Sequence, residues 1–136
     1  MGRSILAIVV GFVLTGALNF GANALFAAVA PDLVPRPGTP TTNTGVLLVI
    51  CAYVAFFGIL GCYVTARLAP SHPLRHALIM GGIALAMSIP ITISAWNDAP
   101  AWFNVYNLLA VMPYAWIGGR IREAELARGA QGRLAS

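Results

Sequence analysis

Long apolar segments separated by short polar connections make up most of this chain. Hydrophobic residues run with few interruptions through four segments, at roughly 4–30, 45–69, 74–96 and 101–121. An α-helix rises about 1.5 Å per residue and the hydrocarbon core of a bilayer is about 30 Å thick, so each segment is long enough to cross a membrane. The pattern predicts an all-α polytopic membrane protein whose four transmembrane helices form one bundle, a single domain over residues 1–136.

Arginine lies almost entirely in alternate connections between these segments. Of the eight basic residues, Arg36 alone falls in the opposite set of connections. The others precede the first segment, flank the second connection or follow the fourth segment: Arg3, Arg67, Arg75, Arg120, Arg122, Arg128 and Arg133. Because cytoplasmic loops carry an excess of Lys and Arg, this asymmetry predicts that both termini are cytoplasmic.

Composition supports a place in the membrane. The chain is 59% hydrophobic and 9% charged, whereas about a quarter of the residues in soluble proteins are charged. The formal net charge of +4 does not indicate nucleic-acid binding, because the arginines are scattered and interleave with Glu123 and Glu125. The bilayer is the expected partner, and four arginines are the expected contacts with its headgroups: Arg67, Arg75, Arg120 and Arg122. The lack of lysine suggests a GC-rich bacterium, and hence a bacterial inner (cytoplasmic) membrane.

Proline marks the first two connections. Residues 31–44 contain four prolines and should form an extended loop on the outer side, since proline cannot continue a helix. In the second connection, Pro73 suits the first helical position, with His72 or Ser71 as the cap.

The two ends of the chain carry further signals. The first segment is longer than the apolar region of about 7–15 residues in a signal peptide, so we expect it to be retained as a helix. The run 122–128 should extend the fourth helix into the cytosol, because it is rich in helix formers. Gly129 should end this helix, and 129–136 should be a flexible tail.

Polar residues inside the apolar segments are the candidate site, since each needs a partner away from water. Thr15, Asn19 and Asn23 recur every four residues and therefore share one face of the first helix. The full candidate set is Thr15, Asn19, Asn23, Thr92, Ser94, Asn104 and Asn107. These side chains either line a polar pocket open to the outer side or hydrogen-bond between helices, each contributing about 1 kcal/mol. We favour the second interpretation, and in both cases Asn19 should point into the bundle.

Small residues should allow the helix backbones to approach one another closely. They are Gly58, Gly61 and Thr65 in the second segment, with Gly81 and Gly82 in the third. Close packing of this kind predicts a tight bundle at those positions.

The sequence holds no set of residues that catalysis or a metal would require. Cys51 and Cys62 lie about 16 Å apart along one helix, which is too far for a disulfide. His72 and His76 flank a turn without the further ligands that a metal site needs. We therefore expect no enzymatic activity, no cofactor and no metal.

One stretch resembles a known group of proteins. The sequence GCYVTARLAP at 61–70, followed by HPLRHA at 72–77, is similar to segments of uncharacterised small four-helix bacterial inner-membrane proteins. This motif is a helix end, a basic turn and a helix start, so the resemblance implies an architecture and carries no activity. Small multidrug-resistance transporters also have four helices, but they depend on an acidic residue in the first helix, and 4–30 contains no charge.

Two functions fit these features. Away from their ends the segments hold no charge, ligand set or nucleophile set, which favours a non-catalytic accessory or scaffold subunit of a membrane assembly. That role implies a membrane-protein partner or a homo-oligomer. The alternative is a small oligomeric channel or transporter for a neutral or weakly polar solute, with an outward-facing pocket at the asparagines.

The arginine asymmetry predicts the topology directly. A reporter that is active only in the cytoplasm should work when fused after Ser136 and fail when inserted near Thr41. Reporter activity at both sites, measured in intact cells, would contradict this topology.

Overall fold

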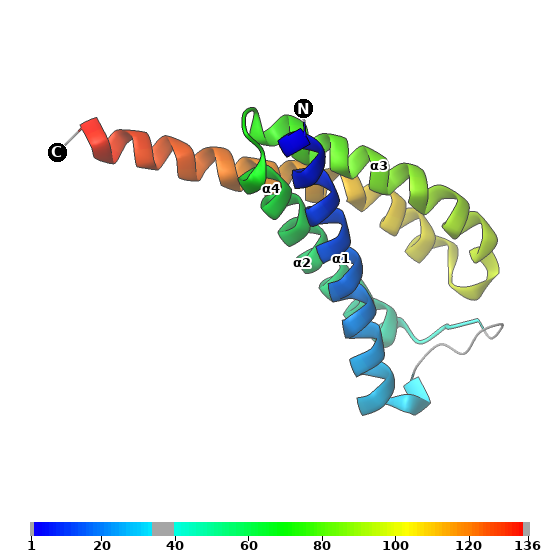
Figure 1. Ribbon diagram of the computed structural model, residues 1–136. Helices are drawn as coiled ribbons and strands as arrows, with labels where there is room; N and C mark the ends of the chain where they lie inside the picture. Colours follow the sequence, from blue (N-terminus) through cyan, green and yellow to red (C-terminus); the bar gives the residue numbers. More distant parts are fainter. Residues whose placement is uncertain (1, 34–39, 135–136) are drawn as a thin grey trace.

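Helices account for nearly all of the chain that the computed structural model describes, residues 2–33 and 40–134 (Figure 1). The four long helices are α1 (Gly2–Val29), α2 (Thr44–Leu68), α3 (Pro73–Ser94) and α4 (Ala101–Leu134). Short 3₁₀ turns, η1 (Pro31–Leu33) and η2 (Trp96–Asp98), follow α1 and α3. The prediction of an all-α chain with four long helices is confirmed. Residues 34–39 of the predicted outer loop, Arg36 among them, lie outside the described residues.

Three of these helices are long and apolar enough to cross a membrane: α1, α2 and α3. α4 is the longest helix but is not among them, because Asn104 and Asn107 interrupt its apolar half and its last turns are charged. The described chain is therefore compatible with a membrane protein, and a fourth span remains a prediction.

The helices form two hairpins that meet at one end and spread apart toward the other (Figure 1). α1 pairs with α2, and α3 pairs with α4, while α2 also packs against both helices of the second hairpin. The hairpins meet near the start of α1 and diverge toward η1 and η2. At the spread ends, the Thr41 backbone N–H donates to the Asp98 carbonyl at 2.9 Å and links the two hairpins.

Glycine and threonine hold α1 against α2 in a reciprocal contact. Thr65 of α2 packs on Gly11 of α1, and Thr15 of α1 packs on Gly61 of α2. A Cβ added at Gly11 would lie 2.7 Å from the Gly61 carbonyl oxygen, so only glycine permits this approach. Each threonine hydroxyl donates to a carbonyl on its own helix, Thr15 to Gly11 at 2.8 Å and Thr65 to Gly61 at 3.0 Å.

Two further glycines make close contacts in the second hairpin: Gly118 joins α4 to α2, and Gly81 joins α3 to α4 within the hairpin. A Cβ at Gly118 of α4 would lie 2.7 Å from both the Ile59 carbonyl oxygen and the Tyr63 amide nitrogen of α2. A Cβ at Gly81 of α3 would lie 2.5 Å from the Ala115 Cβ. A buried apolar cluster surrounds these contacts and consists of Cys62, Ala66, Ala77, Met80 and Ala115. We call the contacts of Gly11, Gly61, Gly81 and Gly118 the glycine layer.

Away from this layer, large apolar side chains point outward. Phe20 is 78% exposed and Val29 is 76% exposed, both on the part of α1 beyond the layer. Exposure of this extent on long apolar helices is costly in water and suits contact with lipid chains.

Several local predictions were wrong or only partly met. α4 continues through Gly129 to Leu134, so Gly129 does not end it and the described part of the tail is helical. A glycine costs about 1 kcal/mol in a helix interior relative to alanine, which the helix formers on either side can offset. Gly82 has no atom within 4 Å of an added Cβ and therefore makes no close approach.

α3 starts at the predicted residues, but its first turn lacks the predicted side-chain cap. His72 is the N-cap and Pro73 occupies the first turn, as expected. His72 adopts a left-handed φ of 47° and its side chain makes no cap hydrogen bond. Instead, Nδ1 of His76 lies 3.1 Å from the His72 carbonyl oxygen.

The glycine layer predicts a sharp difference between two glycines of the apolar helices. Gly118→Ala should lower the free energy of unfolding by about 1–3 kcal/mol, because the new methyl group meets backbone atoms that cannot move aside. Gly82→Ala makes the same chemical change in open space and should leave stability unchanged or slightly raised. Thermal unfolding in mild detergent measures both, and equal effects of the two variants would contradict the layer.

Candidate functional site

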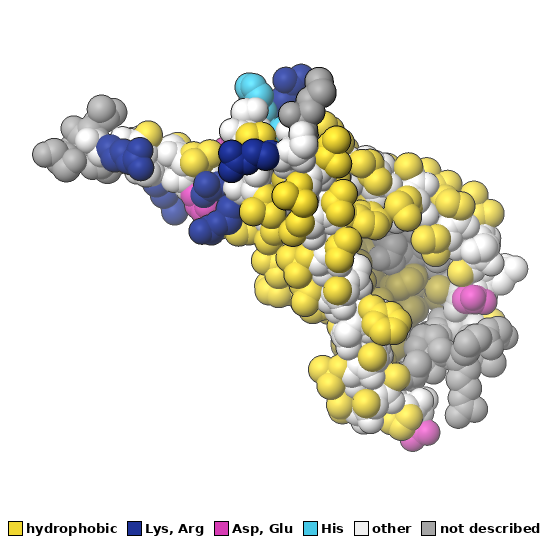
Figure 2. Space-filling view, viewed as in Figure 1, with side chains coloured by type: hydrophobic (Ala, Val, Ile, Leu, Met, Phe, Trp, Pro, Cys, Tyr) yellow, Lys and Arg dark blue, Asp and Glu magenta, His cyan; other side chains and the backbone are white. Residues whose placement is uncertain are grey.

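A cavity of about 150 Å³ lies beside the glycine layer, lined by side chains from all four helices. Its polar lining consists of Thr15, Asn19, Ser88, Asn107 and Tyr114, and the rest is apolar. Figure 2 shows the surface hollowed between the two hairpins, with hydrophobic side chains along the sides of the hollow. The cavity thus occurs where the helices begin to separate.

Asn19 is the most unusual residue of this cavity. Its Nδ2 donates to the Thr15 carbonyl oxygen one turn earlier at 2.9 Å, a bond within α1 itself. Its Oδ1 is buried and accepts no hydrogen bond from the described residues. A buried carbonyl oxygen without a donor costs about 1–3 kcal/mol, so this oxygen favours any molecule that brings a donor into the cavity.

The other polar groups of the cavity follow the same pattern. Nδ2 of Asn107 donates to the Phe103 carbonyl at 2.9 Å, and Ser88 Oγ donates to the Ala84 carbonyl at 2.8 Å. Each of these bonds stays within one helix, and each amide nitrogen keeps a second N–H, so the cavity offers donors as well as the free acceptor at Asn19. The Tyr114 hydroxyl lies 3.0 Å from the hydroxyl of Tyr106, which places a second polar group next to the cavity wall.

The remaining predicted site residues lie elsewhere. Asn23 is exposed, and its Oδ1 accepts from the Tyr53 hydroxyl at 2.8 Å, which ties α1 to α2. Asn104 is buried and donates to the Trp96 carbonyl at 3.0 Å, so it holds the turn between α3 and α4. Ser94 donates to a carbonyl within its own helix, and Thr92 is half-buried.

Of the seven predicted residues, the structure therefore brings three to the cavity: Thr15, Asn19 and Asn107. Sequence reasoning missed Ser88 and Tyr114. Ser88 carried a signal, because it is a hydroxyl inside an apolar segment one turn before Thr92. Tyr114 carried none, since an aromatic residue near the middle of a segment is ordinarily a packing residue.

A polar cluster lies at the arginine-rich end of the bundle. The Tyr63 hydroxyl donates to Glu125 Oε1 at 2.8 Å and accepts from Arg67 Nη1 at 2.8 Å. Arg122 Nη1 donates to Glu125 Oε2 at 2.9 Å. The hydrogen bond from Arg122, helped by that from Tyr63, holds the pKa of Glu125 below its usual range. This cluster joins the end of α2 to the charged part of α4.

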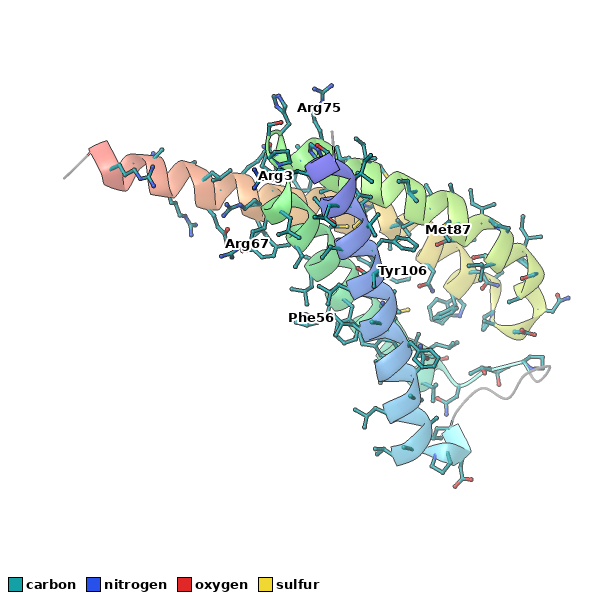
Figure 3. The ribbon with its side chains drawn as sticks, viewed as in Figure 1. Arg3, Phe56, Arg67, Arg75, Met87 and Tyr106 are labelled. Carbon is teal, nitrogen blue, oxygen red and sulfur yellow. The ribbon has the colours of Figure 1, made fainter. Side chains whose placement is uncertain are left out.

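The four arginines expected at lipid headgroups differ in their surroundings. Arg67 and Arg122 belong to the cluster at Glu125, and Arg120 pairs with Glu123 at 3.2 Å. Arg75 is exposed and lies at the same end of the molecule as Arg67 and Arg3 (Figure 3).

The cysteines and histidines add no further site. Cys51 and Cys62 are both buried and free, as their separation along one helix predicted. Within residues 2–33 and 40–134, no three His, Cys, Asp or Glu side chains gather as a metal ion would require.

No protein family, curated protein or solved structure matches this chain.

Proposed function

We propose that this chain is an integral membrane protein with four spans, α4 being the fourth, and with both termini on the cytoplasmic side of a bacterial inner membrane. Three helices apolar enough to span support the proposal, together with the packing of α4 against α2 and α3 in the same bundle. The charge distribution also supports it. Arg3, Arg67 and Arg75 share one end of the molecule, as expected for the cytoplasmic side.

We further propose that the cavity beside the glycine layer binds a small neutral solute that donates hydrogen bonds, as part of a channel or transporter. The buried, unpartnered Oδ1 of Asn19 carries this proposal, because a solute N–H or O–H would supply the donor that this oxygen lacks.

Size and charge narrow the solute class. None of the described side chains that line the cavity is charged, so an ion would lose its hydration there without compensation. An engineered cavity of about 150 Å³ in another protein admits benzene, so the volume here suits a solute of about six heavy atoms or fewer.

The accessory or scaffold role is the second candidate, and the spread of the two hairpins favours it. Large apolar side chains remain exposed on all four helices, and at the spread ends a hydrogen bond between Thr41 and Asp98 joins the hairpins. A partner helix lying between the hairpins would bury apolar surface from both. This role predicts a stoichiometric protein partner.

Solute flux tests the leading proposal. Proteoliposomes should take up urea or glycerol faster than empty liposomes, as followed by stopped-flow light scattering. Asn19→Leu should lower this flux about tenfold, because the solute loses its acceptor. Its stability should be maintained or rise, because among the described residues the Asn19 side chain bonds only within α1 and leucine removes the buried oxygen that lacks a donor.

Asn23→Leu is the matched control. It makes the same change one turn along α1, on a residue outside the cavity, and should leave the flux unchanged. Equal flux in wild type and Asn19→Leu would contradict a role of Asn19, and no flux above empty liposomes would contradict the transporter. In that event, co-purification of a stoichiometric partner in mild detergent would support the accessory role.

A further inference from the structure

A second hollow of the molecule lies on the outside of the bundle, between α2 and α4. It is a groove of about 210 Å³ lined by Phe56, Ile59, Leu60, Tyr63 and Ile121. Every lining group except the Tyr63 hydroxyl is apolar. Phe56, which is 64% exposed, lies on the side of α2 away from the hollow between the hairpins (Figure 3).

The groove ends at the polar cluster described above. Phe56 and Tyr63 are seven residues apart, so the apolar floor extends about 10 Å along α2 before it reaches the tyrosine hydroxyl. Arg67 follows one turn later and donates to that hydroxyl at 2.8 Å. The order along the helix is therefore apolar groove, hydroxyl and guanidinium, which matches the acyl chain, ester region and phosphate of a phospholipid.

The charges of the cluster favour an anion at this end. Both carboxylate oxygens of Glu125 accept hydrogen bonds, Oε1 from Tyr63 and Oε2 from Arg122. Arg67 is exposed and uses Nη1 for the tyrosine hydroxyl, whereas a guanidinium carries five N–H donors. Two arginines against one carboxylate leave the cluster with a net positive charge.

We infer that this groove binds one anionic phospholipid of the cytoplasmic leaflet, with an acyl chain along Phe56 and Leu60 and its phosphate on Arg67. The inference rests on the proposed membrane topology, but the site is separate from the solute cavity and does not depend on transport. Because the groove lies between α2 and α4, a bound anionic lipid would contact both helices.

Native mass spectrometry with equal amounts of phosphatidylglycerol and phosphatidylcholine tests the inference. The wild-type chain, released from mild detergent, should retain one phosphatidylglycerol in preference to phosphatidylcholine. Arg67→Gln should weaken this retention about fivefold, which is the factor for one arginine near an anionic surface. Arg67→Lys keeps the charge and should restore most of the preference.

Two further variants separate a specific site from general attraction. Arg128→Gln removes the same charge from an exposed position on α4 outside the groove, and should leave retention unchanged. Leu60→Trp fills the groove without changing any charge, and should weaken phosphatidylglycerol retention while the melting temperature is maintained.

Three results would overturn the inference. Equal retention of the two lipids would show that the headgroup does not contribute to binding. An equal effect of Arg128→Gln and Arg67→Gln would show that the lipid is attracted by the general positive charge and not by this site. A dimer without bound lipid that Leu60→Trp dissociates would mean that a second copy of the chain covers the groove.

Discussion

The reciprocal contact of Gly11 with Thr65 and of Gly61 with Thr15 is the constraint on which this structure depends. Lipid chains are as apolar as leucine, so burial of apolar surface does not drive helices together inside a bilayer, and close van der Waals contact must do so. The absence of a Cβ on each glycine allows that contact. Each threonine side chain fills the space left by the missing Cβ of the glycine that it faces. Its hydroxyl donates to a carbonyl of its own helix, so this contact leaves no hydroxyl unpaired.

The cavity follows from the tightness of this layer. α2 carries the α1 contact at Gly61 and the α4 contact at Ile59 and Tyr63, so three helices are fixed within about one helical turn. Beyond this level the hairpins diverge, and the cavity forms among Gly58, Asn19 and Tyr114. The same layer brings Tyr63 to Glu125 on the opposite side of the helices. The proposed solute cavity and the proposed lipid groove are thus two consequences of one packing contact.

The sequence predicted the local features well, because they depend on composition and helical period. Each of these features arises from composition or spacing within one segment of the chain: the four helices, Pro73 at the start of α3, and the shared face of Thr15 and Asn19. It did not predict which polar residues meet. Asn104 and Asn107 lie on the same helix, yet one closes a turn and the other lines the cavity, because rotation and crossing of the helices decide which face is enclosed. Gly81 and Gly82 differ for the same reason.

Distances between spin labels in nanodiscs can show whether the helices meet at the glycine layer and spread beyond it. One pair of labels is attached near the layer, at Ile5 of α1 and Ile79 of α3. The other pair is attached at the spread ends, at Val29 of α1 and Ile93 of α3. All four positions are exposed. The account predicts a clearly longer distance between Val29 and Ile93 than between Ile5 and Ile79. Equal distances, as in a parallel-sided bundle, would contradict it.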